Sequence, residues 1–118
     1  MKTLVIGASN NPERYSYKAI DSLLNHRHEV IAVSNKKAEV LGLQIEDTST
    51  IYTDVDTITL YVGPANQSYY EDYILATKPR RVIFNPGTEN DALEAKLNES
   101  GIETTEACTL VLLATGQY

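Results

Sequence analysis

The stretch KTLVIGASNNPERYSY, from Lys2 to Tyr17, predicts a strand, a tight loop and the start of a helix. Residues 3–6 are β-branched or aliphatic without polar alternation, as in a strand buried on both faces of a parallel sheet, and Gly7 ends the run. Pro12 fixes its own φ angle and disfavours a helical Asn11, so the helix is predicted to begin beyond it. The free N–H groups of that helix end would then lie above the strand, where a phosphate is stabilised.

This loop is a reduced form of the dinucleotide-binding pattern G-x-G-x-x-G. Gly7 supplies the first glycine, whereas Ser9 and Pro12 occupy the other two glycine positions. The motif alone therefore identifies no ligand, and an ordinary turn between strand and helix is the alternative interpretation. Evidence from other segments of the chain is needed to distinguish a ligand-binding loop from an ordinary turn.

Composition favours one globular domain. With 118 residues, 42% of them hydrophobic and 22% charged, the chain can bury a single core, and we expect one domain over residues 1–118. A net charge of −6 argues against a nucleic-acid partner, because nucleic acids are bound by broad basic faces. No apolar run is long enough to span a bilayer and no leader pattern is present, so we expect a cytoplasmic protein with no membrane partner.

Cysteine, histidine and basic residues narrow the chemistry further. The single cysteine, Cys108, cannot form an internal disulfide, and no Cys/His group has metal-ligand spacing, so no metal is predicted. The basic residues form only small local groups, Lys36 with Lys37 and Arg80 with Arg81. A pair of this size suits one phosphate group better than a polymer, although both pairs can equally be solvated surface charges.

Short apolar runs and turn signals divide the chain into strands and helices. The predicted strands are residues 3–6, 30–33, 57–62, 81–84 and 102–104. The predicted helices run from beyond Pro12 to about residue 26, from an N-cap at Asn66 to Lys78, and from a capping pattern at Thr88 and Asp91 to Gly101. A last helix is predicted over residues 108–113, with an extended segment over residues 109–115 as the alternative. Between residues 36 and 56 there is no helical periodicity, and an extended segment is predicted instead.

Buried-type strands that alternate with helices form parallel sheets with helices on both faces. We therefore predict an α/β fold, a single-domain Rossmann-like open parallel sheet of five strands in the order 3-2-1-4-5. Gly7, Gly63 and Gly87 then lie just beyond the carboxyl ends of strands one, three and four. Because open α/β sheets bind ligands at this edge, the glycine loops predict a ligand site there.

The residues after the second strand indicate the kind of ligand. NAD-binding domains of this type carry an acidic residue there, which hydrogen-bonds the ribose hydroxyls of the adenosine. This chain has Ser34, Asn35, Lys36 and Lys37 at that place. Lysines in place of a carboxylate favour an adenosine ribose that carries a phosphate, as in NADP or coenzyme A.

Four segments resemble the bacterial CoA-binding domain family. They are GASNNPERYSY at residues 7–17, LYVGP at 60–64, VIFNPGTEN at 82–90 and EACTLVLL at 106–113. That family is similar in fold to the CoA-binding domain of the succinyl-CoA synthetase α subunit. The resemblance covers nearly the whole chain and implies a domain that binds coenzyme A or a short acyl-CoA. The synthetase also uses a second subunit and a phosphorylated histidine on a following domain, and this chain has neither, so synthetase activity is not implied.

The same resemblance assigns roles to individual residues. The diphosphate would be bound by Gly7, Ala8, Ser9, Asn10, Arg14 and Ser16. The adenosine phosphate region would contact Ser34, Asn35 and Lys36, and the pantetheine arm Val62, Gly63 and Pro64. Asn85, Pro86 and Gly87 would close the site.

No catalytic arrangement is recognisable from residue spacing. There is no Ser-His-Asp pattern and no motif of paired carboxylates, so we assign no catalytic residue and expect binding without a reaction. Cys108, which follows Glu106 at a possible helix start, is expected to pack in the core rather than to react. The alternatives are an NADP-binding reductase-like module and an interaction domain without a ligand, and no protein partner is predicted.

Overall fold

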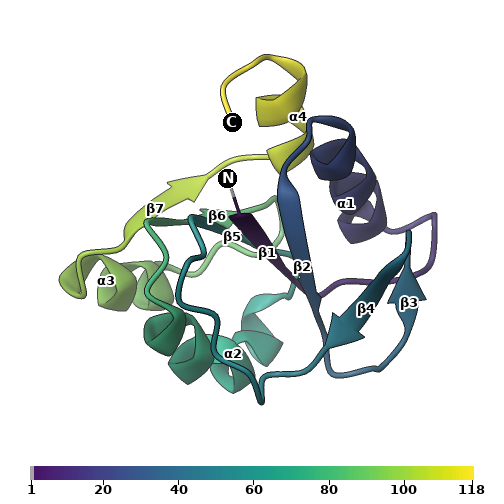
Figure 1. Ribbon diagram of the computed structural model, residues 1–118. Helices are drawn as coiled ribbons and strands as arrows, with labels where there is room; N and C mark the ends of the chain where they lie inside the picture. The colour runs from purple at the N-terminus through teal and green to yellow at the C-terminus, as the bar shows by residue number, and fades with distance from the viewer. Residues whose placement is uncertain (1) are drawn as a thin grey trace.

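A mostly parallel sheet with helices on both faces forms the molecule. The computed structural model describes residues 2–118. The strands are β1 (Lys2–Ile6), β2 (Glu29–Val33), β3 (Glu39–Val40), β4 (Leu43–Glu46), β5 (Thr57–Leu60), β6 (Arg81–Phe84) and β7 (Glu103–Glu106). The helices are α1 (Tyr15–Asn25), α2 (Pro64–Thr77), α3 (Asp91–Glu99) and α4 (Thr109–Ala114) (Figure 1). The predicted α/β class with a parallel sheet is therefore confirmed.

The predicted strand number and order are wrong. Among residues 2–118 the sheet has seven strands in the order β3-β4-β2-β1-β5-β6-β7, instead of five in the order 3-2-1-4-5. The predicted third strand corresponds to β5, which pairs in parallel with β1 rather than at the outer edge of β2. This strand also ends at Leu60, two residues earlier than predicted.

The segment between β2 and β5 explains the different order. Its extended stretch, which the sequence predicted, forms the antiparallel pair β3–β4, joined by a turn in which Leu41 and Gly42 have positive φ angles. β4 then pairs in parallel with β2, with Ala32 opposite Ile45. Because β4 already occupies the outer edge of β2, the chain passes on to the opposite side of β1, where it forms β5.

The helices cover the two faces of the sheet in pairs. α1 and α4 lie on one face and α2 and α3 on the other (Figure 1). Alternate residues of β1 point to opposite faces: Leu4 and Ile6 pack in the core on the side of α2 and α3, and Val5 packs on the side of α1. All three side chains are fully buried, which explains the continuous apolar run in the sequence.

Two helix starts differ from the prediction. α2 begins at Pro64 after an N-cap at Gly63, so Asn66 lies inside its first turn and does not cap it. α3 is capped by Asn90, whose side chain accepts a hydrogen bond from the Leu93 amide at 3.2 Å, rather than by Thr88. Thr88 is buried, and its hydroxyl donates to the carbonyl of Asn85 at 2.7 Å. Proline at the first helical position and asparagine at the cap are both common choices.

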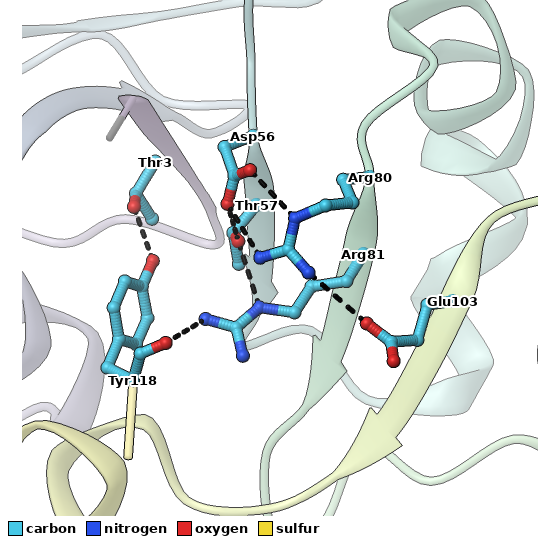
Figure 2. A network of polar contacts seen from close by, with 7 residues as sticks. All are labelled: Thr3, Asp56, Thr57, Arg80, Arg81, Glu103 and Tyr118. Carbon is cyan, nitrogen blue, oxygen red and sulfur yellow. Dashed lines mark hydrogen bonds and ion pairs between the residues drawn. The ribbon is translucent and has the colours of Figure 1, made fainter. Parts of the chain in front are cut away.

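A polar network occupies the amino ends of β5 and β6, opposite to the predicted ligand edge (Figure 2). Arg80 donates to Asp56 at 2.9 Å and contacts Glu103 at 3.4 Å, and its hydrogen bond lowers the pKa of the Asp56 carboxyl. Arg81 is buried, donates to Thr57 at 3.0 Å and to the Tyr118 carbonyl at 3.0 Å, and lies over the Tyr118 ring. Neither arginine is therefore available for a phosphate at the ligand edge.

None of the helices formed by residues 2–118 combines the length and the apolar character needed to cross a membrane.

Candidate functional site

The carboxyl edge of the sheet is hollowed where β1 lies beside β5. Here the connections from the two strands diverge, since β1 leads to α1 on one face and β5 leads to α2 on the other. Two cavities of about 620 Å³ and 500 Å³ lie at this point, and Gly7, Ser34, Asn35, Tyr61 and Gly63 line both of them. We call them together the cleft. Its place is the crevice in which open α/β sheets bind ligands.

Gly7 is required by the packing of the sheet. Its φ angle is +90°, and a Cβ atom there would lie 2.9 Å from the Tyr61 carbonyl oxygen and 3.0 Å from Val62 Cγ2. The amides of Gly7 and Ala8 both donate to the carbonyl of Val33, at 2.9 and 3.1 Å. These two amides are therefore not free for an anion.

Free backbone donors at the cleft come from the first turn of α1, which follows the loop after β1. The loop is held by hydrogen bonds from the Asn11 amide to Ser9 Oγ and from the Glu13 amide to Asn11 Oδ1, at 3.1 and 3.0 Å. The first amides of α1, at residues 15–17, have no carbonyl four residues earlier within the helix. Because α1 has eleven residues, the positive end of its dipole adds to this donor group.

Two cations on the cleft wall have no partner within the described chain. Among residues 2–118, no hydrogen bond or ion pair engages the side chains of Arg14 or Lys36, and both line the larger cavity. Lys37 lines a separate cavity with Asp47. Glu13 is also on the wall of the larger cavity and opposes part of the positive charge. The arrangement favours an anion between α1 and the end of β2.

Gln67 joins two of the loops that form the cleft. This side chain is 1% exposed, and its amide nitrogen donates to the carbonyls of Val62 and Thr88, at 2.9 and 2.6 Å. Its oxygen accepts from Asn90 at 2.9 Å. Since all of its groups are used, Gln67 fixes the loop after β5 against the loop after β6.

Asn85 has a similar structural role at the end of β6. It is 1% exposed and donates to Thr59 Oγ1 and the Leu60 carbonyl, at 2.7 and 2.9 Å. Its oxygen accepts from the backbone amide of Thr109, the first residue of α4, at 2.9 Å. Asn85 therefore holds α4 to the sheet, and its side chain has little capacity left for a ligand.

Most residues that the sequence assigned to the site lie together on the cleft wall. These are Gly7, Ala8, Ser9, Arg14, Ser16, Ser34, Asn35, Lys36, Val62, Gly63, Pro86 and Gly87. Asn10 and Pro64 are exposed and line neither cavity, and Asn85 lines a smaller neighbouring one.

Sequence reasoning missed the tyrosines of the cleft. Tyr61 lines both cavities, whereas Tyr15 and Tyr69 lie on the wall of one cavity each and are 67% and 63% exposed. Tyr61 directly precedes Val62 and Gly63, which were predicted to line the site, but it falls within the strand predicted over residues 57–62. Tyr15 and Tyr69 carried no periodic signal, because an exposed aromatic residue on a helix fits no core pattern.

Carboxylates gather at the β7 side of the same sheet edge. One oxygen from each of Asp91, Glu94 and Glu106 lies within 4.8 Å of the others. Partial burial, together with the nearby Glu106 carboxylate, raises the pKa of Glu94. Like charges at this spacing repel, so this part of the edge disfavours a phosphate.

The comparisons with known proteins agree with this architecture. A family model described as CoA binding domain matches residues 1–114. A crystal structure of an uncharacterized protein is 50% identical, with a TM-score of 0.97 over 99% of this chain and 97% of the other. A conserved hypothetical protein from Pyrococcus furiosus is 27% identical, with a TM-score of 0.79 over 88% of this chain and 90% of the other.

More distant similarity extends to a protein from Thermus thermophilus. Its structure is 20% identical, with a TM-score of 0.85 over 99% of this chain and 90% of the other, and shows the same fold. A search of curated proteins found no match.

Proposed function

The chain belongs to the CoA-binding domain family, and from this premise we propose that its cleft binds coenzyme A or a short acyl-CoA. The observation that carries the proposal is the distribution of charge on the wall of the larger cavity. The free amides of α1 and Arg14 lie on one part of the wall, and Lys36 lies at the end of β2. Two separate anion positions match the diphosphate and the ribose phosphate of coenzyme A.

Each part of the wall has a proposed partner in the ligand. Ser9, Arg14, Ser16 and the first amides of α1 bind the diphosphate. Ser34, Asn35 and Lys36 contact the adenosine and its phosphate. Val62 and Gly63 lie along the pantetheine arm. Because Gly7 and Ala8 use their amides within the sheet, their contribution is the close approach that small residues permit.

Binding without catalysis is part of this proposal. Within residues 2–118, no histidine lines either cavity of the cleft. Burial raises the pKa of the Tyr61 hydroxyl well above its usual range, so this group stays protonated at neutral pH and is no general base. The wall thus offers groups that bind anions rather than groups that transfer protons.

Lys36 and Lys37 allow a matched test of the ribose phosphate. We expect the wild-type protein to bind coenzyme A at least about tenfold more tightly than dephospho-coenzyme A, since a charged contact is worth roughly 1–3 kcal/mol. Lys36→Ala should bind both ligands about equally, because it lacks the cation that distinguishes them. Lys37→Ala removes the same charge from the other side of the chain and should keep the preference. Isothermal titration calorimetry of the three proteins with both ligands measures these affinities.

The affinities of the wild-type protein for the two ligands test the role of the ribose phosphate. Equal affinity for the two ligands would show that the phosphate makes no contact, and the role of Lys36 would be withdrawn. Loss of the preference in Lys37→Ala but not in Lys36→Ala would place the phosphate on the other side of the β2 terminus. An increase in salt concentration should weaken the preference, because the contact is exposed.

A further inference from the structure

A third cavity of about 260 Å³ adjoins the cleft at the end of β6. Tyr15, Tyr61, Asn85, Pro86 and Cys108 line it. Tyr15, Tyr61 and Pro86 also line the larger cavity of the cleft, so the two spaces share part of one wall. The small cavity is built mainly from aromatic, proline and thiol groups, which favour a weakly polar occupant.

The distribution of charge along the carboxyl edge of the sheet favours one orientation of the bound ligand. Lys36 and Arg14 lie on the β2 and α1 side of the cleft. Glu106 ends β7 two residues before Cys108 and belongs to the carboxylate group with Asp91 and Glu94. A ligand with phosphates at one end and a neutral group at the other is therefore favoured with its neutral end toward Cys108.

The hydroxyl and amide groups behind the small cavity are engaged with or packed against one another. The hydroxyls of Thr59 and Thr109 bond to each other at 2.7 Å, and Asn85 uses its amide group within the protein. The Tyr61 hydroxyl is buried beside the hydroxyls of Thr59 and Thr109, which limit the rise of its pKa, although no hydrogen bond of normal geometry joins them. Burial raises the pKa of this hydroxyl, and Tyr61 and Cys108 line the same small cavity. The surface that an occupant of the small cavity meets is therefore weakly polar, which suits a thiol or a thioester.

Cys108 is half-buried rather than fully packed in the core, contrary to the expectation from the sequence. We propose that the small cavity receives the sulfur end of coenzyme A, so that the ligand thiol or thioester lies beside Cys108 and Tyr61. The assignment rests on the proposed function, and it places the end of the pantetheine arm at β6 rather than beside Tyr69. A cavity of about 260 Å³ leaves room for the thiol and a small acyl group only.

Cys108 provides its own probe of this geometry. The mixed disulfide of coenzyme A and pyridine-2-thiol transfers its CoA part to a nearby thiol. The Cys108 thiolate attacks the CoA sulfur, the original disulfide bond breaks, and pyridine-2-thiolate leaves and takes up a proton as the coloured thione. Thione release gives the rate, and intact mass spectrometry identifies the adduct. 2,2′-Dipyridyl disulfide, which carries no nucleotide, measures the intrinsic reactivity of each thiol.

Ser68 supplies the matched control, because it is exposed on the wall of the 500 Å³ cavity beside Tyr69. The double variant Cys108→Ser with Ser68→Cys keeps one thiol but moves it to the other cavity. With the dipyridyl reagent as the reference, we expect wild-type Cys108 to react roughly one hundred times faster with about 10 µM CoA probe, since a tethered group has a millimolar effective concentration. Excess adenosine 3′,5′-bisphosphate should suppress this acceleration.

The control variant should show little acceleration by the CoA probe. Faster labelling of the Ser68→Cys thiol than of Cys108 would overturn the assignment and place the sulfur end in the other cavity. No acceleration at Cys108, in a protein that binds coenzyme A by calorimetry under reducing conditions, would overturn it as well. Failure of that calorimetric binding would instead refute the proposed function on which the assignment rests.

Discussion

Gly7 shows how a single residue can shape a cleft through packing within the protein. The first glycine of a phosphate-binding loop is usually explained by close approach of the backbone to phosphate. In this protein its amide is bonded to Val33, and its missing side chain leaves space for the carbonyl of Tyr61. The residue therefore brings β1 and the end of β5 together, and this contact forms the floor between the two halves of the cleft.

A substitution at Gly7 should act on stability first. Gly7→Ala places a methyl group 2.9 Å from a backbone oxygen at a φ angle of +90°. We expect it to lower the free energy of unfolding by about 3 kcal/mol, from the unfavourable φ angle and the overpacking together. Urea unfolding followed by circular dichroism measures this loss.

Gly42→Ala separates the cost of the unfavourable φ angle from the cost of overpacking. Its φ angle of +83° is nearly the same, but nothing lies within 4 Å of the added Cβ atom. This variant should lose only about 1–2 kcal/mol. Equal losses at the two positions would show that the contact with Tyr61 makes no contribution.

At the scale of the elements, buried amide side chains decide where the loops and α4 lie. Asn85 connects β5, β6 and the first residue of α4 through three hydrogen bonds. α4 is only six residues long, too short to be stable by itself. Its position, and with it the position of Cys108, therefore depends on Asn85.

Asn85→Asp tests this dependence with almost no change in volume. The carboxylate cannot donate to the Leu60 carbonyl, and two acceptors would face each other in a buried place. We expect a loss of about 2–4 kcal/mol in the free energy of unfolding. The same exchange at exposed Asn66 in the first turn of α2 should be neutral or slightly stabilising, because an acidic residue there favours the helix dipole. A loss below about 1 kcal/mol for Asn85→Asp would contradict the role given to this residue.

The same scale shows what the sequence could predict. The buried strands and their glycine loops carry strong local signals, and the structure places Gly7, Gly63 and Gly87 beyond β1, β5 and β6 as expected. The strand order failed because β3 has two residues and β4 has four, and such short pairs carry almost no periodicity. Whether a connection adds strands at one edge or crosses to the other side depends on contacts between distant residues.

Like the fold, the candidate site could be predicted only where its residues are close together in the sequence. Its phosphate side follows from residues adjacent in sequence to strand ends, as with Lys36 after β2. The Tyr61 and Cys108 wall comes from residues far apart in the chain, and only the docking of α4 against β5 and β6 brings them together. A cavity wall of this kind cannot be recognised before those contacts are known.

At the scale of the whole molecule, an acidic protein must present a locally positive site to an anionic ligand. The net charge is −6, and the carboxylates of Asp91, Glu94 and Glu106 gather at one side of the carboxyl edge. Arg80 and Arg81 are engaged at the opposite edge (Figure 2). The α1 terminus with Arg14 and Lys36 is thus left as the positive part of the cleft, and in the proposed function it both binds and orients the anionic ligand.

The central claim is that this cleft is a coenzyme A site, and calorimetric titration of the ligand-free protein with coenzyme A and with NADPH tests it most directly. Both ligands carry a diphosphate and a ribose phosphate, so Lys36 and α1 can contact either one. Only coenzyme A has the long arm that reaches the cavity at Cys108. We expect coenzyme A to bind at least about tenfold more tightly, a difference of about 1.4 kcal/mol. Equal or tighter binding of NADPH, or no binding of coenzyme A at millimolar concentration, would contradict the account.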